Sequence, residues 1–161
     1  MTRHITLTVI LLLASLSARA ASRLFRFERS TNRNYICYDV QLKDGSLDMK
    51  NPIHVYWIRA EEDGREKELT YIQRKLAFGY KVVHKGHNEV DIHLTAYSKL
   101  TIRICQRNGQ WLAVANINGK EAQLTKLFAQ MQSPNSLHVL YVDLFGKDLK
   151  TGEAVRERIN N

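Results

Sequence analysis

The chain has 161 residues and a formal net charge of +8, with its basic residues interspersed among acidic ones rather than gathered into blocks. The length fits a single domain with enough chain to bury a hydrophobic core. Dispersed charge is typical of an ordinary solvated surface, so the composition argues against a nucleic-acid-binding protein.

An apolar run opens the chain and ends at a small-residue motif. Arg3 precedes the run, residues 5–13 are almost entirely apolar, and Ala18-Arg19-Ala20 follows, which is the pattern of a secretory signal peptide. The run is too short to span a bilayer, which takes about 20 apolar residues. We expect residues 1–20 to be a signal peptide cleaved near Ala20; the alternative is an uncleaved anchor or a buried helix.

The expected mature chain is one domain over residues 21–161, in the periplasm or secreted, without a transmembrane segment. Removing the leader takes away two arginines and no acid, which leaves 22 basic and 16 acidic residues and a net charge of +6. This balance favours acidic partners. Candidate partners are an envelope glycan, a lipid or another envelope protein, and we expect neither nucleic acid nor a cofactor.

Short segments that alternate apolar and polar residues recur along the rest of the chain. They are separated by turn sequences such as Asp44-Gly45 and Asn118-Gly119, and only two prolines occur. Period-2 alternation between glycine-containing turns is typical of antiparallel β structure. We expect strands at residues 35–42, 53–59, 79–84, 90–94, 100–106, 111–117, 137–145 and 155–159.

One segment among these strands is expected to be helical. Thr70 and Gln73 match a capping box, in which each side chain satisfies a backbone N–H group at the start of a helix. Ile72 and Leu76 have the spacing of one helix face, and Gly79 is a common C-terminal stop. An irregular loop is the alternative.

Residues 124–131 are compatible with two structures. Leu124, Leu127, Phe128 and Met131 have helical spacing, but the preceding Asn118-Gly119 favours a type I′ hairpin with a returning strand. We favour the strand because turn chemistry is the more specific signal. The whole pattern predicts a mainly β fold, an antiparallel β-sandwich or partly closed barrel, with one short helix packed on it near residues 70–77.

Two cysteines, Cys37 and Cys105, remain in a chain that we expect to reach an oxidising compartment. Alternation places each of them on the polar face of its strand. A disulfide needs Cα atoms about 5.5 Å apart, so a Cys37–Cys105 bond and two separate thiols both stay open.

Signatures of catalysis are missing. The chain lacks a Gly-x-Ser-x-Gly elbow, a Walker loop and a GxGxxG motif. His84, His87 and His93 lie close in sequence, but their spacing is not that of a zinc site, so we expect solvated histidines and no metal. His54 lies in an apolar strand, where a buried imidazole needs a hydrogen-bond partner.

Two polar sets are candidates for a binding site. In residues 28–34, Arg29, Asn32 and Asn34 could grip a carboxylate or a sugar hydroxyl, unless the amides only form turns. The second set interleaves aromatic residues with Gln and Arg, which suits a sugar or lipid-like ligand unless the rings form a core cluster. It comprises Tyr56, Trp57, Tyr71, Gln73, Arg74, Phe78 and Tyr80. We predict a ligand site made of Arg29, Asn32, Asn34, His54, Tyr71, Gln73 and Arg74.

Three blocks of sequence resemble a known family. They are FERSTNRN at residues 27–34, NPIHVYWI at 51–58 and YIQRKLAFGY at 71–80. The family consists of uncharacterised secreted bacterial proteins and is known only as a domain of unknown function. The likeness runs from about residue 25 to the C-terminus, and it implies an exported bacterial domain without an activity, cofactor or catalytic residue to transfer.

The leading interpretation is a non-enzymatic periplasmic or envelope-associated binding module. The alternative is a small hydrolase acting on envelope material, in which His54 works with Arg29 or Arg74 in an aromatic-lined cleft. The two interpretations differ in whether these three side chains converge in one pocket. A protein–protein module that uses an exposed strand edge is a third possibility.

Overall fold

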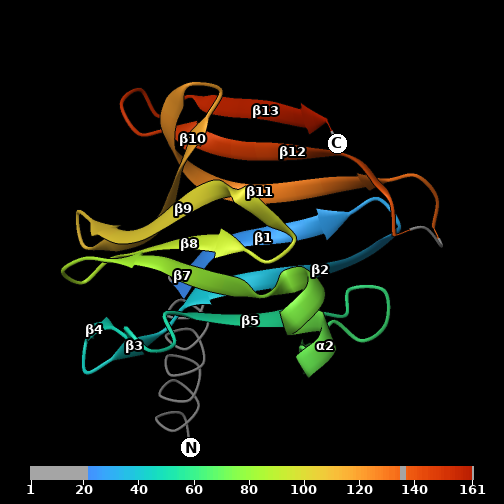
Figure 1. Cartoon of the computed structure of the whole chain (residues 1–161), viewed down its shortest axis with the longest axis horizontal. Helices are drawn as coiled ribbons and strands as arrows, with labels where there is room; N and C mark the ends of the chain where they lie inside the picture. The colour runs from blue at the N-terminus through green and yellow to red at the C-terminus, as the bar shows by residue number, and fades with distance from the viewer. Residues whose placement is uncertain (1–21, 135–136, 161) are drawn as a thin grey trace, which may run out of the picture.

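A computed structural model describes residues 22–134 and 137–160, most of which lie in β-strands (Figure 1). The first half of the chain contains β1 (Arg23–Arg29), β2 (Asn32–Val40), β3 (Leu42–Lys43), β4 (Ser46–Leu47), β5 (Ile53–Ile58), β6 (Glu66–Glu68), the short helix α2 (Tyr71–Gln73), the π-helical turn η1 (Arg74–Phe78) and β7 (Tyr80–Lys85). The second half contains β8 (Val90–Leu94), β9 (Tyr97–Arg107), β10 (Gln110–Ile117), β11 (Lys120–Met131), β12 (Val139–Asp148) and β13 (Ala154–Asn160).

One large sheet curls into a half-barrel. Its strands follow the order β6-β5-β2-β1-β11-β10-β9-β8-β7, with β12 and β13 joined to it through β11. Residues 120–123 of β11 pair with β10 and residues 126–129 pair with β1, while β12 occupies the opposite edge of β11. The pairing of β1 with β11 is parallel and the other pairings are antiparallel. The mainly β prediction is confirmed, in the form of a partly closed barrel.

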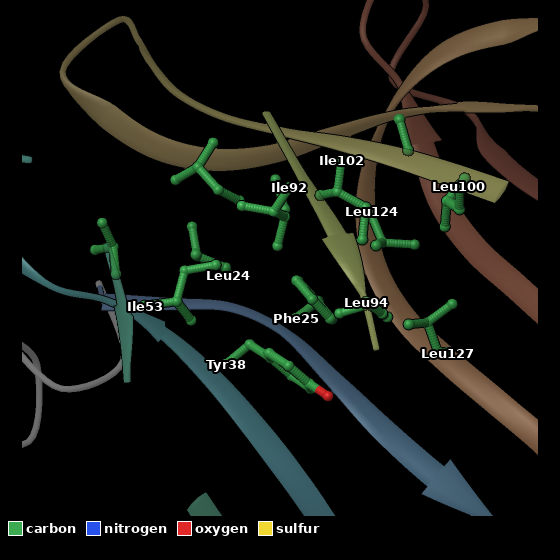
Figure 2. Close-up of a cluster of buried hydrophobic side chains, with 14 of the residues drawn as sticks. Leu24, Phe25, Tyr38, Ile53, Ile92, Leu94, Leu100, Ile102, Leu124 and Leu127 are labelled. Carbon is green, nitrogen blue, oxygen red and sulfur yellow. The ribbon is translucent and has the colours of Figure 1, made fainter. Parts of the chain in front are cut away.

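The core lies between the two ends of the curled sheet (Figure 2). Side chains of β1, β2 and β5 meet side chains of β8, β9 and β11 there. The Phe25 and Tyr38 rings stack with their centroids 4.3 Å apart, and Ile92, Ile102 and Leu124 are fully buried. The alternation that predicted the strands therefore also selects the buried face.

Side chains join the two ends of the sheet, where β5 and β7 lie near each other. The Tyr80 hydroxyl donates to the Ile53 carbonyl at 3.1 Å and accepts from the Ile53 N–H at 3.2 Å. The Tyr38 hydroxyl donates to the Phe78 carbonyl at 2.8 Å. These bonds attach the helical segment and β7 to the strands on the far side of the core.

The helical segment begins with the expected capping box. The Gln73 N–H donates to the Thr70 hydroxyl at 3.2 Å, and the Thr70 N–H donates to the Gln73 side-chain oxygen at 2.9 Å. The chain then continues as the π-helical turn η1 and stops at Gly79. The expectation that Ile72 and Leu76 pack on the sheet is wrong, because these side chains are 66% and 69% exposed. Only the end of the segment, at Phe78, packs against the core.

The contested residues 124–131 belong to strand β11, which confirms the hairpin. Asn118 and Gly119 have φ values of 52° and 77°, as a type I′ turn requires. Strand β1 was not predicted. A bulge between Arg23 and Phe25 makes Leu24 and Phe25 both buried, so the simple alternation breaks there.

The structure contains Cys37 and Cys105 as free thiols. Cys37 lies on β2 and Cys105 on β9, and the sheet order places β1, β11 and β10 between these strands. Both cysteines are buried, although neither belongs to the main core cluster. Cys105 packs in a separate small cluster with Leu112 and Val114. Burial raises the pKa of the Cys37 thiol to about 12, which keeps it protonated and unreactive near neutral pH.

None of the helices within residues 22–134 and 137–160 is long and apolar enough to cross a membrane.

Candidate functional site

A polar pocket of about 350 Å³ lies at one end of the inner face of the sheet. Phe25, Phe27 and Arg29 alternate along β1, so the strand face that builds the core also carries Arg29. Strands β2 and β5 contribute Asn34 and Trp57 in the same way, and the start of α2 completes the wall. Figure 1 shows α2 beside β5, at the open end of the half-barrel.

Arg29 lies over two aromatic rings. Its guanidinium carbon is 5.2 Å from the centroid of Trp57 and 5.6 Å from the centroid of Phe78, which are cation–π distances. Burial lowers its pKa, although a guanidinium remains charged at neutral pH. No carboxylate of the described residues pairs with it. Within the described part of the chain, Arg29 is thus a partly desolvated cation without a counter-charge.

Two buried donor atoms of the pocket have no hydrogen-bond partner in the described part of the chain. They are Arg29 Nε and the indole nitrogen Nε1 of Trp57. Leaving such a donor unpaired costs about 1–3 kcal/mol, and most buried polar side chains avoid that cost. Both nitrogens belong to side chains that line the pocket.

The remaining charges of the pocket leave it positive. Glu62 is paired with Arg59, which also lies 3.9 Å from Asp63. Lys67, whose position on β6 is opposite Trp57, has no ion pair within residues 22–134 and 137–160. The positive charges of Arg29 and Lys67 therefore stay uncompensated, and the pocket suits an anion.

Two side-chain amides add donors to the same wall. The Asn34 side-chain oxygen accepts from the Glu61 N–H at 3.0 Å, and the Gln73 side-chain oxygen accepts from the Thr70 N–H. These bonds use the oxygen of each amide and fix its orientation. The NH₂ groups of Asn34 and Gln73 have no partner among the described residues, so they can donate to a ligand.

The chain matches a protein family described as a domain of unknown function, DUF4833, over residues 25–158. It belongs to that family. The match confirms the resemblance of the three sequence blocks. No curated protein and no solved structure matches the chain.

The structure of the DUF4833 domain brings three of the predicted site residues together. Arg29, Asn34 and Gln73 line the pocket. Asn32 lies next to it, where its side-chain oxygen accepts from the Asn34 N–H at 3.1 Å and shapes the β1–β2 turn. Tyr71 is 74% exposed and does not line the pocket.

The other two predicted residues meet elsewhere. His54 Nε2 lies 2.5 Å from one carboxylate oxygen of Glu68, and Arg74 donates to the other oxygen at 2.6 Å. His54 therefore finds its hydrogen-bond partner on β6, away from Arg29. The three side chains proposed for a hydrolase do not converge in one pocket of the DUF4833 domain.

Lys67, Arg59 and Thr70 line the pocket but were not predicted as site residues. Lys67 stands in the acid-rich stretch at residues 61–68, which has the composition of a solvated turn. Only its pairing opposite Trp57 on β5 brings it to the pocket. Thr70 was recognised as a helix cap, which is its structural role, and Trp57 only as part of the aromatic set.

The histidines near the β7–β8 turn do not assemble a metal site in this structure. Within the described residues no group of three or more His, Cys, Asp or Glu side chains could hold a metal ion. His93 Nε2 instead lies 3.0 Å from the Thr101 hydroxyl, on the neighbouring strand β9.

A second pocket, of about 240 Å³, lies inside the half-barrel and is mainly apolar. Its wall includes Phe27, Leu94, Leu127 and Val142 from four strands, and Phe78 from the end of η1. The DUF4833 domain thus has a cationic pocket and an apolar pocket that share neighbouring residues of the same strands.

Proposed function

We propose that this DUF4833 domain is a non-enzymatic binding module, and that the pocket around Arg29 takes a small anionic group such as a carboxylate or phosphate. The observation that carries the proposal is the pair of buried, unpartnered donors, Arg29 Nε and Trp57 Nε1, in one positive pocket.

The chemistry of the pocket favours an anion for three reasons. A guanidinium presents donors in a planar fork that matches a carboxylate or phosphate. Its attraction for an anion is stronger where protein replaces water, because the local dielectric constant is lower. Lys67, Asn34 and Gln73 supply further donors around the same space.

The hydrolase alternative has no observation in its favour. His54 and Arg74 both engage Glu68, so neither is placed to act with Arg29. Within the described residues the pocket contains no histidine and no cysteine that could serve as a base or nucleophile.

Export belongs to the same proposal. Residues 1–21 lie outside the described part of the chain, so the support is the apolar run and the Ala18-Arg19-Ala20 motif. We propose a periplasmic or envelope-associated location, where anionic glycans and lipids are available as ligands.

Tryptophan fluorescence tests the anion site. The chain has two tryptophans, so the Trp111→Phe variant leaves Trp57 as the sole reporter. We expect inorganic phosphate or butyrate to change its emission saturably. Arg29→Gln should weaken binding on the order of tenfold to a hundredfold, because a charge-assisted hydrogen bond is lost.

Arg33→Gln is the matched control, because Arg33 is an exposed arginine on the same β1–β2 hairpin and does not line the pocket. Its affinity should equal that of the parent. If Arg29→Gln lowers the melting temperature sharply and leaves affinity unchanged, Arg29 is a structural clamp over Trp57 and Phe78, and the proposal is wrong.

A further inference from the structure

The cationic pocket and the apolar pocket adjoin along two strands. On β1, Phe27 lines the apolar pocket and Arg29 lines the cationic one. The two residues share one face of the strand and are about 7 Å apart, because a strand rises about 3.3 Å per residue. On β2, Tyr38 lines the apolar pocket and Asn34 lines the cationic one.

The Phe78 ring touches the linings of both pockets. It belongs to the wall of the apolar pocket, where its centroid is 5.7 Å from that of Phe27. It also lies 5.2 Å from the Trp57 ring, edge to face, and 5.6 Å from the Arg29 guanidinium carbon. Phe78 therefore lies between the Arg29 site and the apolar pocket.

The apolar pocket has the character of a hydrocarbon site. Leu94, Leu127 and Val142 line it, and its polar groups come from Lys99, Asn160 and the tyrosines Tyr38 and Tyr97. A volume of about 240 Å³ is below the range of about 300–1,000 Å³ that holds drug-sized ligands. The pocket is too small for two acyl chains and suits one.

From this juxtaposition we infer that the ligand is a single-chain anionic amphiphile. Its carboxylate or phosphate head binds at Arg29 and Lys67, and its alkyl chain passes Phe78 into the apolar pocket. The inference rests on the proposed anion site and adds the chemical class of the ligand. In it, the apolar pocket binds the alkyl chain of that ligand.

The test is a series of straight-chain carboxylates from butyrate through octanoate to dodecanoate, each below its micelle concentration, with binding measured by calorimetry on the full chain. Affinity should rise by about fourfold per methylene, because each buried CH₂ contributes about 0.8 kcal/mol. The rise should stop once the pocket is full. Dodecyl phosphate in place of dodecanoate shows which head group the site prefers.

Two variants separate the head site from the chain site. Arg29→Gln should weaken dodecanoate on the order of tenfold or more and leave dodecanol unchanged. Ala77→Trp, in the half-buried end of η1, should fill the apolar pocket and abolish the chain-length dependence while butyrate still binds. Circular dichroism and the melting temperature check that both variants fold.

Three outcomes would overturn the inference. Affinity that does not depend on chain length would show that the second pocket takes no chain, while butyrate binding would leave the anion site intact. If Lys99→Gln weakened dodecanoate but not dodecanol, and Arg29→Gln had no such effect, the head group would lie at Lys99 and not at Arg29. No binding of any anion would end both the inference and the proposed function.

Discussion

Asp143 shows how single residues hold the sheet. Its buried carboxylate accepts from Arg158 at 2.8 and 2.9 Å and from Arg156 at 2.6 Å, across the β12–β13 pair. These hydrogen bonds, with Arg158 the largest contributor, lower its pKa to about 2. A depressed folded-state pKa stabilises the fold above the ordinary aspartate value near 4, and the contribution is lost as pH falls toward 2.

We therefore predict that the free energy of unfolding, measured by urea denaturation, falls between about pH 4 and pH 2. Asp143→Asn should reduce stability by about 1–2 kcal/mol at pH 7, because charged acceptors are lost, and should flatten that pH dependence. Asp44→Asn, in an exposed turn, is the control, with a change within about 0.5 kcal/mol. Equal losses in the two variants would contradict the role given to Asp143.

At the same scale, part of the site follows from the sequence. Arg29, Asn34 and Gln73 are predicted because guanidinium and amide groups beside aromatic residues suit a polar ligand. Lys67 is missed because its role depends on a cross-strand position opposite Trp57. His54 and Arg74 lie outside the pocket because both side chains pair with Glu68, an exposed acidic residue on the three-residue strand β6.

Among the elements, the junction of β5 and β7 is the point where the half-barrel is held together. The Tyr80 hydroxyl makes both of its hydrogen bonds to the backbone of Ile53. Tyr80→Phe should therefore destabilise the protein by about 1–2 kcal/mol in urea unfolding, because it leaves a backbone donor and acceptor unpaired. Faster hydrogen exchange at the Ile53 amide should accompany the loss.

Tyr71→Phe provides the matched control for Tyr80→Phe. The Tyr71 ring is 74% exposed, so removal of its hydroxyl should leave the stability unchanged. If Tyr80→Phe is as stable as this control, the hydroxyl does not fasten the junction.

The elements themselves are predictable where local pattern decides them. Hairpins such as β10–β11 follow from the Asn118-Gly119 turn, and the capping box locates the start of α2. Strand β1 is missed because its bulge breaks the alternation, and β6 because all three of its residues are charged. Burial of the helical face is predicted wrongly, since Ile72 and Leu76 face solvent.

At the scale of the molecule, the alternation of apolar and polar residues predicts either a β-sandwich or a partly closed barrel and does not distinguish between them. The sheet closes partly into a barrel because one edge of β11 pairs first with β10 and then with β1. The β1–β11 pairing joins strands about a hundred residues apart in the sequence, so no local sequence pattern predicts it. It also brings the end of β1, and with it Arg29, to the open end of the half-barrel.

Export is a prediction about the whole chain. N-terminal sequencing of the protein produced from its full reading frame should begin at Ala21 or within a few residues, because the Ala-x-Ala motif ends at Ala20. A membrane-bound product that retains Met1 would contradict cleavage.

The anion site is tested most directly by nuclear magnetic resonance of the two unpartnered donors. We predict that saturating butyrate shifts the Nε–H resonance of Arg29 and the indole N–H resonance of Trp57, because both donors gain an acceptor. The Trp111 indole resonance should stay in place. If the Arg29 and Trp57 resonances do not move at saturating butyrate, or if only the Trp111 resonance moves, the pocket around Arg29 is not an anion site.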